Sequence, residues 1–154
     1  MPAQPVTADR VRAHLPAVGV IAVGGGIGSV LRYGLARAVP SAPGDFPVAT
    51  LITNLLGSLL LGALVVAVTE VWRPHRLLRP ALGTGLLGGF TTFSTFAVDV
   101  RGLALPAAGG FVAATVVGGL LLALAGMAAV RRIEPRLVAA SAHEFVDPFD
   151  PDLP

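Results

Sequence analysis

The sequence predicts an all-α membrane protein with four transmembrane helices, the third of them broken between about Gly88 and Thr92. Of its 154 residues 54% are hydrophobic and only 13% are charged, a balance typical of membrane proteins. The apolar residues form four segments, separated by short stretches that carry turn residues and arginines. The third segment holds glycines and hydroxyl residues where a lipid-facing helix would hold Leu, Ile, Val and Ala.

The length allows one membrane domain with short flanks. We expect a polar N-terminal tail over residues 1–16, a four-helix transmembrane domain over 17–133, and an acidic, proline-containing and disordered tail over 134–154. The absence of cysteine excludes disulfides and thiolate chemistry. No nucleophile–base pair or metal-ligand set is visible, so the sequence does not indicate an enzyme. The net charge of +2 is too small to indicate a nucleic-acid partner.

The first apolar segment covers residues 17–39. Gly24 and Gly28 are four residues apart, a spacing of small residues that lets two membrane helices approach closely. Arg32 lies inside the segment, where an arginine is costly unless it snorkels, pairs or faces water. Two interpretations stay open: Arg32 snorkels to the interface beside Tyr33, or it supplies a cation at a vestibule that attracts anions.

The second segment, residues 46–71, is long enough to cross a bilayer. Thr50, Asn54 and Ser58 follow one another at intervals of four, so they share one helix face. Asn54 lies near the middle of the apolar run, where its amide must find partners. A hydrogen bond to another helix is one explanation, and donation to a permeating or bound species is the alternative.

The third segment covers residues 80–100 and contains the stretch GTGLLGGFTTFSTF at 83–96. Its paired glycines, Gly88 and Gly89, each weaken a helix by about 1 kcal/mol. Broken backbone at membrane depth is tolerated only where it is packed in protein or lines a cavity. The segment is therefore interpreted as an interrupted helix at a functional centre, with a close-packed helix as the alternative.

The residues after the predicted break carry donors but no fixed charge. Phe93 and Phe96 share a helix face, and Thr92 and Thr95 do the same. The edge of an aromatic ring is its positive rim, and a hydroxyl donates hydrogen bonds. Such a face can hold a small anion without a cationic side chain. Asp99 closes the segment and is expected near the interface.

The fourth segment covers residues 106–130. Small residues recur every four positions at Gly110, Ala114 and Gly118, which predicts one face packed on a partner helix. Thr115 is the one polar side chain in this run. We expect its hydroxyl to bond its own helix backbone, with membership of a polar track as the alternative.

Three blocks together resemble the CrcB/Fluc family of fluoride channels. They are GG-x-x-G-x-x-x-RY from Gly24, TL-x-x-N-x-x-GS from Thr50, and the stretch at 83–96. The resemblance covers about residues 18–130, and the third block is the most specific. It implies a channel that passively exports cytoplasmic fluoride and so lowers its toxicity. It also implies an antiparallel, dual-topology dimer with two pores in the cell membrane.

The resemblance assigns the pore residues by position. Asn54 matches the family's pore asparagine. Phe93 and Phe96 match the aromatic box residues, and Ser94 and Thr95 belong to the polar track.

The resemblance also implies a vestibule residue and a structural ion. Arg32 matches the family's first-helix arginine at the vestibule. The backbone carbonyls of Gly88 and Thr91 match those that hold a structural Na⁺ at the dimer axis, a ligand type that suits a hard cation. Asp99 stands where many members have glutamate, so the carboxylate is kept with one methylene fewer.

The arginines predict an orientation. With four spans, the termini and the second loop share one side, which holds eight arginines: Arg10, Arg12, Arg73, Arg76, Arg79, Arg131, Arg132 and Arg136. The other side holds Arg37 and Arg101, or three with Arg32. This bias predicts termini on the cytoplasmic side. The antiparallel partner is then the same chain inverted or an oppositely oriented paralogue.

Two other functions compete with a channel. A proton-coupled small multidrug exporter needs a carboxylate within the membrane, whereas Glu70 and Asp99 lie near span ends. A non-transporting membrane scaffold needs only small-residue packing, but it leaves Asn54 and the Phe/Thr/Ser stretch unexplained.

Overall fold

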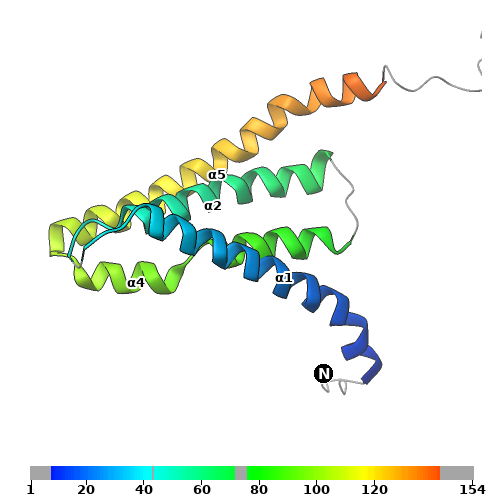
Figure 1. Cartoon of the computed structure of the whole chain (residues 1–154). Helices are drawn as coiled ribbons and strands as arrows, with labels where there is room; N and C mark the ends of the chain where they lie inside the picture. The colour runs from blue at the N-terminus through cyan, green and yellow to red at the C-terminus, as the bar shows by residue number, and fades with distance from the viewer. Residues whose placement is uncertain (1–7, 43, 72–75, 143–154) are drawn as a thin grey trace, which may run out of the picture.

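The structure, a computed structural model, describes residues 8–42, 44–71 and 76–142. Within this part of the chain, four segments are long and apolar enough to cross a membrane: His14–Ala38, Val48–Val71, Pro80–Gly102 and Leu105–Ile133. They run up and down through short connections, so α1 begins at the end of the bundle where α5 finishes (Figure 1). The predicted all-helical, four-span architecture is confirmed. Trp72, Arg73 and His75 of the second loop lie outside the described residues.

The elements are α1 (Ala8–Ala38), α2 (Val48–Val66), the π-helices η1 (Ala67–Val71) and η2 (Pro80–Leu87), α3 (Gly88–Phe90), α4 (Phe93–Gly102) and α5 (Leu105–Ala142). The second span joins α2 to η1, and the third joins η2, α3 and α4. Both outer helices are longer than expected. α1 begins within the predicted polar tail, and α5 continues to Ala142, where disorder was expected from residue 134. Alanine, leucine and arginine are frequent in both extensions and favour the helix. Residues 1–7 and 143–154 of the two tails lie outside the described part.

Two helix pairs make up the bundle, with α2 packed on α5 and α1 packed on η2 and α3 (Figure 1). Glycines bring the second pair together at backbone distance. A Cβ atom on Gly24 would overlap the carbonyl oxygen of Ala81, and one on Gly28 would overlap that of Leu86. The close approach predicted from the spacing of Gly24 and Gly28 is therefore confirmed.

The predicted small-residue face of α5 packs on α2 only in part: a Cβ on Gly118 would meet Leu55 Cδ2 at 3.0 Å, whereas Gly110 lies outside the contact. An added Cβ on Gly110 would have no neighbour within 4 Å, so this residue does not pack on α2. The contact face also includes Phe111, which is fully buried, and Gly126, whose Cβ would overlap the carbonyl oxygen of Leu59. Small residues surround α5 on several sides, so their spacing alone did not select the packed face.

The third span changes conformation at its middle. In η2 the backbone follows a π-helical pattern, and the N–H of Gly88 donates to the carbonyl of Gly83. α3 ends at Phe90, and the next two residues have extended backbone: Thr91 at φ −71°, ψ 161° and Thr92 at φ −148°, ψ 122°. α4 then begins. The extended pair separates the helical pieces and turns its peptide groups toward neighbouring elements.

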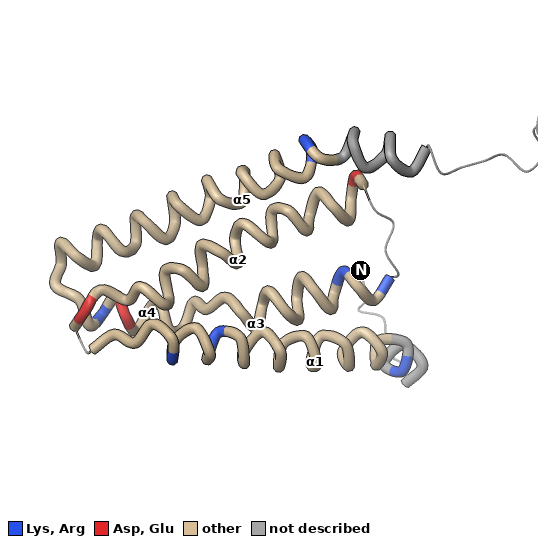
Figure 2. The backbone as a smooth tube through the Cα atoms, turned by 45° about the horizontal axis from the view of Figure 1, so that its top comes forward, with Lys and Arg blue, Asp and Glu red and all other residues tan. Residues whose placement is uncertain are grey.

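Charged residues gather toward the two ends of the bundle and leave its middle largely free of charged residues (Figure 2). At the end where α1 begins, Arg131 Nη2 lies 2.7 Å from Glu70 Oε1 and joins α5 to η1. At the other end, the Thr50 hydroxyl donates to Asp99 Oδ2 at 2.7 Å and joins α2 to α4. These two interactions connect neighbouring elements at the two ends of the bundle.

Candidate functional site

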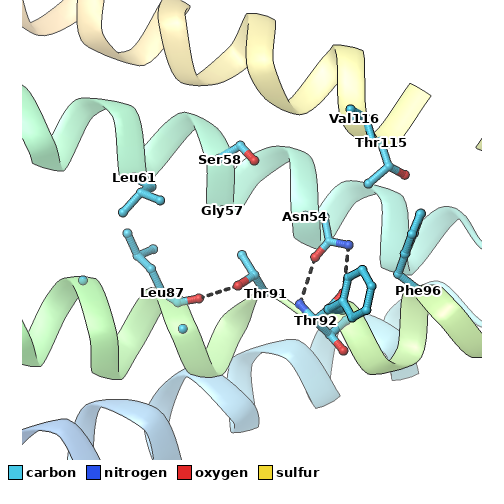
Figure 3. Close-up of a pocket in the computed structure, with 13 residues that line it drawn as sticks. Asn54, Gly57, Ser58, Leu61, Leu87, Thr91, Thr92, Phe96, Thr115 and Val116 are labelled. Atoms are coloured by element: carbon cyan, nitrogen blue, oxygen red, sulfur yellow. Dashed lines mark hydrogen bonds between the residues drawn. The ribbon is translucent and has the colours of Figure 1, made fainter. Parts of the chain in front are cut away.

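The centre of the site is a double hydrogen bond between Asn54 on α2 and the backbone of Thr92. The Asn54 Nδ2 donates to the Thr92 carbonyl at 3.0 Å, and the Thr92 N–H donates to Asn54 Oδ1 at 2.9 Å (Figure 3). Thr92 is only 7% exposed, so water does not satisfy its peptide groups. Asn54 therefore makes a hydrogen bond to another span, which was one of its two interpretations from the sequence. Because an amide nitrogen carries two hydrogens, one N–H remains for another acceptor.

The Thr92 side chain caps the N-terminus of α4. Its hydroxyl oxygen accepts the Thr95 N–H at 3.1 Å and lies 3.0 Å from Thr95 Oγ1, to which it donates. Ser94 Oγ is 3.4 Å away, which places three hydroxyls in one cluster. Threonine before an apolar helix is a helix-capping signal. That signal was available in the sequence, but the prediction placed Thr92 only on a shared face with Thr95 and not among the site residues.

A cavity of about 420 Å³ adjoins this junction. Its lining includes Asn54, Ser58, Thr92, Phe93, Phe96 and Thr115, and no charged side chain among the described residues. The ring centroids of Phe93 and Phe96 are 6.0 Å apart with planes tilted by 39°, as expected for residues that share a face. Phe96 also lies 5.2 Å from Phe111 on α5, whereas Phe93 is 81% exposed.

Thr115 is a lining residue of this cavity, and its hydroxyl is unsatisfied. Its Oγ1 is buried and has no hydrogen-bond partner among the described residues. The expectation that it bonds its own helix backbone is therefore wrong. The side chain instead extends from α5 toward Phe96 and Asn54 (Figure 3). A buried hydroxyl without a partner is costly, so this oxygen destabilises the packing of α5 in the structure described.

A second cavity of about 280 Å³ lies on the α1 side of Thr92. Arg32, Thr53 and Thr95 are among its lining residues, and Thr92 lines both cavities. Arg32 Nη1 donates to the Thr91 carbonyl at 3.4 Å, so the guanidinium turns inward instead of only snorkelling along the lipid face. Ser94 lines neither cavity and is exposed.

The carbonyls at the end of α3 have the chemistry of a hard-cation site. The last carbonyls of a helix lack partners within the helix and carry partial negative charge. Gly88 is exposed and lines the first cavity. Among the described residues, the Thr91 oxygen accepts a 3.4 Å bond from Arg32, and a carbonyl has two lone pairs. Both residues thus fit the Na⁺ that the family resemblance implies.

Fold and site together define a small multi-span membrane protein with a polar, uncharged cavity between its helices. The chain belongs to the CrcB-like protein family, described as Camphor Resistance (CrcB), which matches residues 19–127.

Individual relatives extend this match over most of the chain. The fluoride-specific ion channel FluC 1 of Streptomyces coelicolor is 43% identical over 126 residues, which cover 79% of this chain and 82% of the relative. FluC 2 of Nocardia farcinica is 46% identical over 115 residues, covering 72% and 82%. FluC 2 of Streptomyces avermitilis is 51% identical over 88 residues, covering 57% of this chain and 56% of that relative.

Proposed function

We propose that this protein is a fluoride-selective ion channel that passively exports cytoplasmic fluoride and so lowers its toxicity. One observation carries the proposal. A single uncharged cavity collects the Asn54 amide, threonine hydroxyls and the Phe93–Phe96 pair, in a chain whose relatives are named fluoride-specific ion channels. The names of these relatives describe an ion channel and not an enzyme.

Neutral donors suit fluoride because the ion holds water strongly. A dry apolar pore would exclude it, and a tight cationic site would trap it. Amide, hydroxyl and ring-edge donors replace shed water while still allowing release. Direction then follows from the membrane potential, which drives an anion out of a negative interior with about 2.3 kcal/mol per charge per 100 mV.

The roles of the pore residues follow from their positions. The second N–H of Asn54 donates to the passing ion, and Phe93 and Phe96 present ring edges to it. Thr95 lines the second cavity and accepts a hydrogen bond from Thr92, so we assign it to the polar track at the start of α4. Ser94 lines neither cavity within the subunit, and we include it through its contact with Thr92. Arg32 concentrates anions at the second cavity, which we assign as the vestibule. The unsatisfied Thr115 hydroxyl supports a place for it along the same path.

The third span acts as an interrupted helix at the axis of an antiparallel dimer in this proposal. Gly88 and the ring of Phe93 are exposed beside the extended residues. Polar backbone at membrane depth needs a protein or ion partner, and a second subunit supplies it. The carbonyls of Gly88 and Thr91 would hold Na⁺ there, where the ion offsets the partial negative charge of two facing helix ends.

The partner and the orientation follow from the arginines. In the described residues, the end of the bundle where α1 begins carries Arg76, Arg79, Arg131 and Arg132 on its loop and helix ends. The bias supports termini on the cytoplasmic side of the cell membrane. An antiparallel dimer then contains an inverted copy of this chain or an oppositely oriented paralogue. Labelling of the C-terminus from each side of the membrane tests this, because equal labelling would establish dual topology.

The competing functions lack a supporting observation. Among the described residues, Glu70 pairs with Arg131 at one end of the bundle and Asp99 bonds Thr50 at the other. Neither carboxylate lines the first cavity, as a proton-coupled exporter would require. A scaffold would not need the amide and hydroxyls collected there.

The decisive experiment is fluoride efflux from liposomes that contain the purified chain alone, with chloride as the control. Fluoride efflux without chloride efflux is expected and also establishes a self-sufficient homodimer. Efflux that requires a co-expressed paralogue supports the heterodimer. No efflux under either condition overturns the proposed function and favours the scaffold.

A further inference from the structure

Gly57 lies one helical turn beyond Asn54 on α2 and faces the side chain of Thr91 (Figure 3). Gly57 is buried. A Cβ atom at this position would overlap the methyl Cγ2 of Thr91. Its other near neighbours, Phe90 Cδ1 and Thr91 Cβ, would both lie at 3.7 Å, which is ordinary van der Waals contact. One methyl group of Thr91 therefore occupies the space of the missing side chain.

α2 thus holds both extended residues of the third span. Asn54 binds the backbone of Thr92 through two hydrogen bonds, and Gly57 receives the methyl of Thr91. We propose that Gly57 is a positioning residue for ion conduction, because with Asn54 it sets where the Thr91–Thr92 backbone lies against α2. This inference rests on the proposed channel function.

A side chain added at Gly57 would alter the pore indirectly, because Thr91 is covalently joined to Thr92 and Thr92 is hydrogen-bonded to Asn54. A side chain at this position pushes Thr91 away from α2, and Thr92 moves with it. The Asn54 bonds of 2.9 and 3.0 Å then lengthen, and hydrogen bonds weaken with distance and misalignment. Because Thr92 also caps α4, the helix that carries Phe93 moves as well. The donors of the cavity lose their alignment.

Other buried glycines of the bundle act differently. An added Cβ on Gly28 or Gly62 would overlap backbone atoms, of Leu86 and Ala123 respectively. Those glycines set the distance between helices, and no side-chain change can relieve the overlap. At Gly57 the obstacle is one methyl group. Thr91→Ser removes that methyl and keeps the hydroxyl, which donates to the Leu87 carbonyl at 3.0 Å.

A double-mutant cycle uses this difference. Gly57→Ala, Thr91→Ser and the double variant are compared with wild type for fluoride efflux, fluoride-over-chloride selectivity and thermal stability. Gly26→Ala is the control for adding a methyl to a helical glycine, since its Cβ would have no neighbour within 4 Å. Gly62→Ala, alone and with Thr91→Ser, tests whether any rescue is specific.

Gly57→Ala is expected to lower fluoride efflux about tenfold or more, as for a methyl forced into a packed site. The double variant should recover to the level of Thr91→Ser alone, while Gly62→Ala should show no rescue. If Gly57→Ala does not fold, recovery of folding and efflux in the double variant supports the proposal. Wild-type efflux from Gly57→Ala, or a double variant no better than it, overturns the proposal.

The proposed function can fail separately. If the wild type carries no fluoride either alone or with a co-expressed paralogue, the channel proposal is wrong. The melting temperatures of the four proteins in the cycle still decide whether Gly57 and Thr91 interact. Coupling between Gly57→Ala and Thr91→Ser in melting temperature then supports the contact between α2 and the extended backbone without its role in conduction, and the assignment of Gly57 to conduction falls.

Discussion

Replacement of Asn54 by leucine removes the double hydrogen bond at the centre of the bundle without opening a cavity, because the two side chains have the same number and branching of heavy atoms. The variant leaves the N–H and carbonyl of Thr92 without partners at a residue that is 7% exposed. Each unsatisfied buried group costs about 1–3 kcal/mol, so the pair costs about 2–6 kcal/mol. At about 2–4 °C per kcal/mol for a protein of this size, the melting temperature should fall by about 10 °C.

The assay is thermal loss of the monodisperse size-exclusion peak in detergent, followed by fluoride efflux from liposomes at a temperature where the variant stays folded. Efflux should be abolished, because both the donor and the backbone that it positions are lost. Ile52→Ala is the control on the same helix, since Ile52 is 38% exposed toward lipid and should change neither measurement. If Asn54→Leu melts within about 2 °C of wild type, less than even the lower bound above, the two bonds do not hold Thr92.

Three further predictions concern single side chains. Phe93→Ile should lower fluoride efflux about tenfold or more, because the ring edge is lost. It should leave the melting temperature nearly unchanged, because the ring is 81% exposed within the subunit. Val98→Ala, at a 66% exposed position of α4, is the control. Thr115→Val should raise the melting temperature, since removal of an unpartnered buried hydroxyl relieves about 1–3 kcal/mol, and should lower fluoride efflux. Gly28→Ala should prevent recovery of folded protein in detergent, because its Cβ would overlap backbone of the third span, whereas Gly26→Ala should be recovered normally.

Each of these predictions has a clear contrary result. Undiminished efflux from Phe93→Ile would remove the ring from the ion path. A lower melting temperature in Thr115→Val would show that the hydroxyl has a partner in the native protein. Normal yield and stability of Gly28→Ala would contradict the backbone contact between α1 and the third span.

Much of the fold could be predicted because membrane insertion depends on composition along the chain. Runs of apolar residues that are bounded by arginine and turn residues define the transmembrane spans, and this does not depend on how the helices pack against one another. The spacing of Gly24 and Gly28 predicted a close approach because small residues have few other uses at that depth. The helix ends were less predictable, since α5 continues to Ala142 through residues that were expected to be disordered.

The site was predicted only in part. Asn54 stood out because an amide is unusual in the middle of an apolar run, and Phe93 and Phe96 stood out because they follow paired glycines among hydroxyl residues. Thr92 did not stand out, because its role depends on a backbone bond to a residue 38 positions away. Thr115 was expected to bond its own helix backbone, although its buried hydroxyl has no partner among the described residues.

The sequence by itself determined the class of protein, the number of spans and the candidate donors, because these follow from residue type and local spacing. The tertiary structure decided which donors meet. It turned Arg32 toward the Thr91 carbonyl, paired Asn54 with Thr92, and placed Gly57 against the Thr91 methyl. Small residues lie on several faces of these helices, so spacing permits more than one packing. Contacts between atoms far apart in the chain select one of them.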